Sequence, residues 1–91
     1  MEHIISNIKK ALNYLDTIIS KDPFSAYLKT SDSLNNSIHC IENKNFSAAK
    51  EELLFSIRMI MEAPPEDSEL ALEILNIIDK SYKTLQSISP D

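Results

Sequence analysis

Glycine, valine and tryptophan are absent from this 91-residue chain, and cysteine occurs once, as Cys40. Glycine supplies the positive φ angles of tight β-hairpins and the close backbone approach of phosphate-binding loops. Its absence argues against a β-rich fold and excludes Gly-rich dinucleotide and P-loop motifs. A single cysteine excludes an intramolecular disulfide, which fits a reducing compartment.

Long hydrophobic runs are also missing. The first ten residues, MEHIISNIKK, contain no uninterrupted apolar run after a basic region, so we do not expect a secretory signal. The longest apolar run is a few residues, far short of the roughly 20 that cross a bilayer. We therefore expect a soluble, cytoplasmic protein that has no membrane partner.

Charge of one sign dominates the composition. The chain carries 14 acidic and 9 basic residues, for a formal net charge of -5. Nucleic-acid binding requires a basic face, so this balance disfavours a nucleic-acid partner. An acidic surface suits a basic protein, although the same balance is common among ordinary soluble proteins. The hydrophobic fraction of 43% is typical of a folded globular chain.

Apolar residues recur at helical spacing through most of the sequence. In the first segment, about residues 2–20, they step by three and four and so share one helix face: Ile5, Ile8, Leu12, Leu15 and Ile19. Pro23 then favours a break and a short helix over about 23–29. Several hydroxyl and carboxylate side chains between Thr30 and Ser33 are candidate caps, which predicts a separate helix over about 32–43.

The polar turn Asn43-Lys44-Asn45 ends that segment, and Ser47 is the expected cap of a helix over about 47–62. This helix is apolar around much of its circumference. It is either a central helix covered on several sides or one that exposes a Phe55 and Met59 patch to a partner. Ala63-Pro64-Pro65 stops it, and a last helix is expected over about 67–88.

These patterns predict an all-α fold. We expect one domain over residues 1–91, a small antiparallel helical bundle of three long helices plus one or two shorter ones. The alternating pattern of β-strands occurs nowhere in the sequence.

No constellation of side chains points to catalysis, a metal or a cofactor. His39 and Cys40 are adjacent, and neighbouring residues on a helix point about 100° apart, so they do not form a nucleophilic dyad. One cysteine and two distant histidines do not make a zinc site. Glu51 and Glu52 diverge in the same way, and no Glu-x-x-His motif is present. We expect a protein that is not an enzyme.

The clearest asymmetry is in the placement of charge. Between Met59 and Asp79 the chain carries six carboxylates and no lysine or arginine. Part of this pattern has a structural explanation, because acidic residues at a helix start gain about 0.3–1 kcal/mol from the helix dipole. The functional alternative is an acidic face that attracts a basic protein and raises its association rate.

The central segment IENKNFSAAKEEL, from Ile41 to Leu53, resembles the MafI-type immunity proteins of bacterial polymorphic toxin systems. The resemblance lies in a helix that ends in Ile-Glu, a short polar turn, an aromatic residue, and then Ala and Glu before Leu. In this resemblance, the run from Ile74 to Ile78 would stand for the closing helix of that family. Tetratricopeptide-like hairpins share much of the same spacing.

The resemblance implies a cytoplasmic antidote that binds and neutralises its cognate toxin domain, often a nuclease. Nucleases present basic surfaces to phosphate, so an acidic face would occupy such a surface. The expected contacts are acidic residues with two apolar neighbours: Glu62, Glu66, Asp67, Glu69, Glu73, Met59 and Met61. The alternative is a non-catalytic adaptor or chaperone-like module, and a homodimer also remains open.

Overall fold

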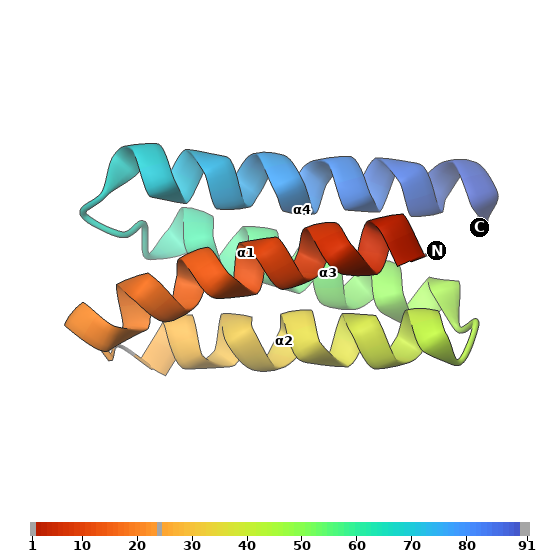
Figure 1. Ribbon diagram of the computed structural model, residues 1–91, viewed down its shortest axis with the longest axis horizontal. Coiled ribbons are helices and arrows are strands. Elements are labelled where there is room, and N and C mark those ends of the chain that lie inside the picture. The colour runs from red at the N-terminus through yellow and green to blue at the C-terminus, as the bar shows by residue number, and fades with distance from the viewer. Residues whose placement is uncertain (1, 24, 90–91) are drawn as a thin grey trace.

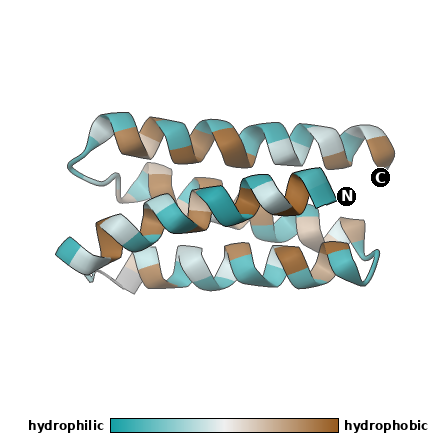
Figure 2. Cartoon of the chain, viewed as in Figure 1, coloured by the Kyte–Doolittle hydropathy of each residue, from teal (hydrophilic) through white to brown (hydrophobic). Residues whose placement is uncertain are grey.

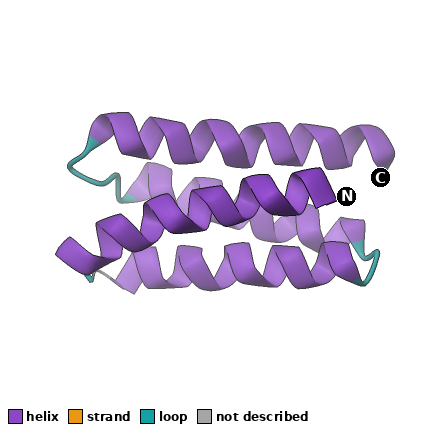
Figure 3. Ribbon diagram, in the orientation of Figure 1, coloured by secondary structure: helices purple, strands orange, loops and turns teal. Residues whose placement is uncertain are grey.

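The computed structural model describes residues 2–23 and 25–89 of the chain. These residues form four helices and no strand, which confirms the all-α prediction (Figure 3). The helices account for most of the described chain and are joined by short turns. Their bounds are α1 (Glu2–Lys21), α2 (Ser25–Glu42), α3 (Phe46–Glu62) and α4 (Ser68–Ile88).

The four helices lie side by side in a compact globule of 35 × 21 × 19 Å, and successive helices alternate in direction (Figure 1). Each helix contacts the helices before and after it in the sequence, and α1 also contacts α4. Within the described residues, α1 and α3 therefore lie on one diagonal, and α2 and α4 on the other. The α1–α2 and α3–α4 turns share one end of the molecule (Figure 1).

The prediction of two helices between residues 23 and 43 is wrong, because α2 runs unbroken from Ser25 to Glu42. The fold thus has four long helices instead of three long and one or two shorter ones. Thr30 does not cap a helix; its hydroxyl donates to the carbonyl of Ala26 within the same helix, at 2.8 Å. Ser37 donates to Leu34 in the same way, at 2.6 Å. Side chains that usually compete with helical hydrogen bonds are here satisfied by the helix itself.

The other helix limits lie within one residue of the expected ones at each end. Phe24 belongs to the predicted 23–29 segment and lies outside the described residues. The start of α3 differs in its cap, since Asn45 rather than Ser47 accepts a hydrogen bond from the backbone N–H of Ala48, at 3.3 Å. Lys44, in the turn before it, takes the positive φ of 60° that a glycine would ordinarily adopt.

Apolar side chains of all four helices meet in one core, and Figure 2 shows the hydrophobic faces turned inward. On α1 the most deeply buried line keeps Ile8 and Leu15 of the predicted stripe and otherwise uses the residue just before each predicted one. Ile5, Leu12 and Ile19 are half-buried. Because α1 touches both α2 and α4, the line that bisects the two contacts is the most buried. Its members are Ile4, Ile8, Ala11, Leu15 and Ile18.

Small side chains shape the contact between α2 and α3, which is the most extensive in the fold. On α2, Thr30, Ser33 and Ser37 are buried, and on α3 Ala49 and Ser56 are buried. Short side chains let two helix backbones approach closely. The hydroxyl of Ser56 donates to the carbonyl of Glu52 at 3.0 Å, so its burial leaves no unsatisfied donor. Within the described part of the chain, no helix is both long and apolar enough to cross a bilayer.

Candidate functional site

The structure brings the five predicted acidic residues to the end of the molecule that holds the α1–α2 and α3–α4 turns. All five are exposed. They come from three consecutive elements: Glu62 ends α3, Glu66 and Asp67 lie in the turn, and Glu69 and Glu73 begin α4. A sixth carboxylate, Asp22, is not evident from the sequence, because only the fold places the α1–α2 turn beside the other five. We call this set the acidic end: Asp22, Glu62, Glu66, Asp67, Glu69 and Glu73.

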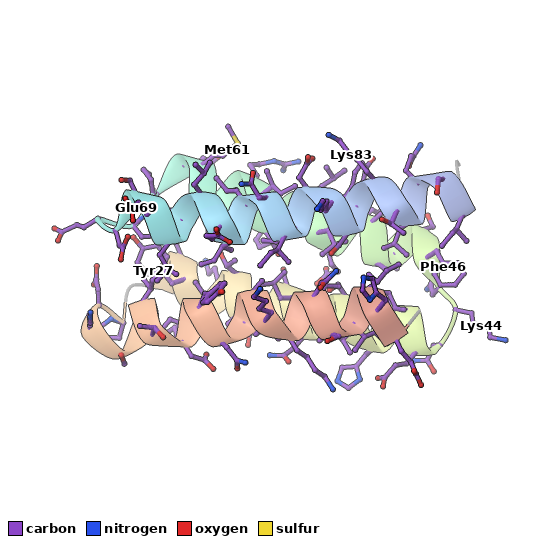
Figure 4. The ribbon with its side chains drawn as sticks, turned by 45° about the horizontal axis from the view of Figure 1, so that its top comes forward. Tyr27, Lys44, Phe46, Met61, Glu69 and Lys83 are labelled. Carbon is purple, nitrogen blue, oxygen red and sulfur yellow. The ribbon has the colours of Figure 1, made fainter. Side chains whose placement is uncertain are left out.

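The charge of the whole chain is concentrated in this half of the molecule. The half comprises residues 12–33 and 55–77, with eight acidic residues against three basic ones, a net charge of -5. This equals the formal net charge of the entire sequence, so the remaining residues are balanced. Glu69 and Lys44 mark the two opposite ends (Figure 4). The molecule is therefore electrically polarised along its long axis.

The carboxylates of the acidic end are not neutralised within the fold. None of the predicted five forms an ion pair with a described residue. The pairs His39–Glu42, at 3.5 Å, and Lys83–Asp79, at 2.9 Å, both lie in the opposite half. Asp67 has a structural role, because its side chain accepts a hydrogen bond from the backbone N–H of Leu70 at 3.0 Å and caps α4.

A hollow of about 520 Å³ opens between the two turns of the acidic end. Tyr27 at its wall is only 5% exposed. Burial raises the pKa of its hydroxyl, and the charges of Asp22 and Glu66 raise it further. The carboxylates of Asp22 and Glu66 therefore both influence the Tyr27 hydroxyl, although they belong to different turns. The residues that line the hollow are Ile18, Lys21, Asp22, Tyr27, Pro65, Glu66 and Asp67.

A second hollow, of about 510 Å³, runs over the start of α4. It combines carboxylates with apolar and aromatic surface, and α1 contributes Tyr14. Lys10, one turn earlier on α1, places its ammonium 5.9 Å from the centre of the Tyr14 ring. The surface of this hollow is therefore mixed, with charged, aromatic and aliphatic side chains side by side. Its lining is Tyr14, Asp67, Glu69, Leu70, Leu72, Glu73 and Asn76.

The two methionines predicted to flank the acidic residues differ in exposure. Met61 is 67% exposed and projects from the end of α3 (Figure 4). Met59 is half-buried. Leu72 on α4 is a further exposed apolar side chain beside the acidic residues, and the sequence pattern did not single it out. Met61 and Leu72 thus supply apolar area near the carboxylates, while Met59 offers less.

His39 and Cys40, which are adjacent in sequence, lie in different surroundings in the described part of the chain. His39 is exposed and faces Glu42, whereas Cys40 is half-buried and free. No group of three His, Cys, Asp or Glu side chains among the described residues has the geometry to hold a metal ion. The features that stand out are charge, exposed apolar side chains and shallow hollows.

Comparison with known proteins provides no family assignment: no protein-family model, no curated protein and no solved structure matches this chain.

Proposed function

We propose that this protein is a non-catalytic binding module, an antiparallel helical bundle whose acidic end binds a basic protein. The observation that carries the proposal is the concentration of the whole net charge in one half of the molecule. Carboxylates that lie unpaired on a surface repel one another, and a basic partner relieves that repulsion. Complementary charge also steers the partner toward the site and raises the association rate.

The surface around the carboxylates supports a protein partner. Specific interfaces bury about 800 Å² on each side and combine apolar contacts with a polar rim. Met61 and Leu72 are exposed next to the acidic residues, and the hollow beside Tyr14 makes part of the surface concave. Long basic side chains of a partner would lie in the two hollows while apolar groups contact the methionine and leucine.

The resemblance of residues 41–53 to MafI-type immunity proteins suggests what such a partner is. We infer that the module is a cytoplasmic antidote and that the basic protein is the toxin domain of the same system. A nuclease fits this role, because its phosphate-binding surface is basic. The antidote would cover that surface and exclude the nucleic acid.

Co-expression with the protein encoded immediately upstream tests the antidote role. We expect the neighbour to arrest growth when it is expressed alone, and this chain to restore growth and to co-purify with it. A harmless neighbour, or one that does not bind, would refute the antidote role.

Charge reversal then tests the acidic end. The double variant Glu69→Lys and Glu73→Lys should lose binding and keep its helical circular dichroism. A matched control reverses Glu2 and Glu42 at the opposite half. Both pairs change the net charge equally, and Glu2 and Glu69 both lie in the first turn of a helix. If the two double variants bind equally well, the acidic end is not the binding surface.

A further inference from the structure

The outward face of α3 carries an apolar pair between two opposite charges. Leu54 and Phe55 are 41% and 36% exposed, although both lie in the middle of the helix. Glu51 lies one turn before this pair, and Arg58 lies one turn after it; both are exposed. At 100° per residue these four side chains cover one side of the helix.

The same four residues border one hollow of about 430 Å³ between α2 and α3. Ser33, Asn36 and Glu52 complete its wall. The apolar pair is therefore not an isolated pair of side chains but part of a continuous, shaped surface. The sequence leaves open whether α3 is covered on all sides, and the structure leaves Leu54 and Phe55 partly exposed on this one.

The two charges on this face are not paired with any residue that the structure describes. Neither Glu51 nor Arg58 forms an ion pair with a described residue, and Arg58 is the only arginine in the sequence. They lie seven residues apart, which is roughly 10.5 Å along the helix. The midpoint between them falls between Leu54 and Phe55. The face is thus symmetric in position and opposite in charge about its own centre.

From this symmetry we infer that the outward face of α3 is a homodimer interface. Two copies pack antiparallel across a two-fold axis that passes between Leu54 and Phe55. In that arrangement Glu51 of each copy opposes Arg58 of the other, so two ion pairs form at once, and the leucine of one copy meets the phenylalanine of the other. A two-fold interface requires this kind of self-complementary surface.

The rest of the helix face agrees with the antiparallel arrangement. The same axis places Ser47 opposite Glu62, so no like charges meet along the exposed side of α3. In a parallel arrangement, Glu51 of one copy would face Glu51 of the other, and Arg58 would face Arg58. Repulsion between these like charges disfavours that arrangement. The apolar and charged residues therefore select the same geometry.

The length of α3 limits the area of the interface and therefore the expected affinity of the dimer. A face centred on 17 helical residues is about 25 Å long and lies at the low end of specific interface sizes. We expect a dimer that dissociates on dilution, and sedimentation equilibrium over a range of protein concentrations measures it directly. A chain that stays monomeric at the highest soluble concentration would overturn the inference.

A charge swap identifies the interface. The Glu51→Arg and Arg58→Glu variants each place like charges opposite one another twice, so each should self-associate roughly tenfold or more weakly. The double variant carrying both changes should regain the dimer. An equimolar mixture of the two single variants should form a heterodimer, because each variant supplies the charges that the other one lacks.

Controls on α1, the helix diagonal to α3, carry the same changes of charge. Asp16→Arg matches the first variant, and Lys9→Glu matches the second; both positions are exposed. Neither should alter the dimer, and circular dichroism should show unchanged helicity for all variants. A dimer that is insensitive to both swaps, or single variants that fail to complement each other on mixing, would place the interface elsewhere. The result is independent of the co-expression test of the antidote role.

Discussion

The ammonium group of Lys50, near the start of α3, donates a hydrogen bond to Oε1 of Gln86, near the end of α4, at 3.0 Å. The same ammonium donates to the carbonyl of Ser89, the residue that caps α4. Lys50 is only 4% exposed. A buried lysine thus links the last turn of α4 to the start of α3 by hydrogen bonds. It also donates to a carbonyl at a helix end, where intrahelical partners are lacking.

Replacement of Lys50 by methionine should lower the free energy of unfolding by about 1–3 kcal/mol. Methionine keeps most of the apolar stem, so the loss reflects the missing donor and the carbonyl that is left without it. Urea unfolding followed by circular dichroism measures the change. Lys9→Met on the exposed side of α1 is the control and should change stability by less than about 0.5 kcal/mol. Equal effects at both positions would contradict a fastening role for Lys50.

Because α2 and α3 approach closely, a larger side chain in place of Ser56 should destabilise the protein. Ser56 is fully buried, so Ser56→Leu inserts volume into a packed contact and should lower stability by about 1–3 kcal/mol. Ser56→Ala removes only a hydroxyl that bonds within its own helix, and it should cost about 1 kcal/mol or less. Thermal unfolding of the two variants separates volume from hydrogen bonding. A leucine variant as stable as the alanine variant would mean that the helices can move apart freely.

Helical periodicity predicted the class of the fold because most of the chain repeats apolar residues at steps of three and four. It failed at residues 30–33, where hydroxyl groups that usually mark helix starts lie inside α2. Thr30 and Ser33 are buried against the neighbouring helices, and that burial stabilises a helix that local propensity alone disfavours. At the start of α4, the Asp67 cap and Glu69 in the first turn agree with the local rules for helix starts.

The candidate site was predicted in part. The run of carboxylates is contiguous in sequence, so its members were found together. Asp22 and Tyr14 join it only through the alternation of the helices, which brings distant turns and faces together. The exposed face of α3 was not predictable either, because apolar residues surround much of that helix and its neighbours decide which of them are covered. The burial of Lys50 is likewise a property of packing.

Tyr27 should make the protein less stable in alkaline solution. Burial, and then the charges of Asp22 and Glu66, raise its pKa above the ordinary value of 10.0 in the folded state. Above pH 10 the unfolded chain releases this proton while the folded chain retains it, so stability falls as pH rises toward the folded-state pKa. Below pH 10 the tyrosine is protonated in both the folded and the unfolded state, so its full contribution to the free energy of unfolding is present. Urea unfolding at a series of pH values above and below 10 measures how steeply the free energy of unfolding falls with pH.

Two variants separate the causes of that alkaline slope. Tyr27→Phe removes the titrating group, so the part of the slope that Tyr27 contributes should vanish. Glu66→Gln removes one of the two charges and should shift the titration of the tyrosine to lower pH, as ultraviolet difference spectroscopy can detect. If Glu66→Gln leaves the titration unchanged, the charge of Glu66 does not contribute to the raised pKa of Tyr27.

Asp67 has two roles that substitution can separate. Its side chain caps α4, and its charge belongs to the acidic end. Asp67→Ala loses both and should lower stability by about 1 kcal/mol. Asp67→Ser keeps a capping oxygen without the charge, so it should remain close to the original stability while a basic partner binds it more weakly. Binding that falls only with the alanine variant would mean that the ordered start of α4, rather than the charge of Asp67, is what the partner recognises.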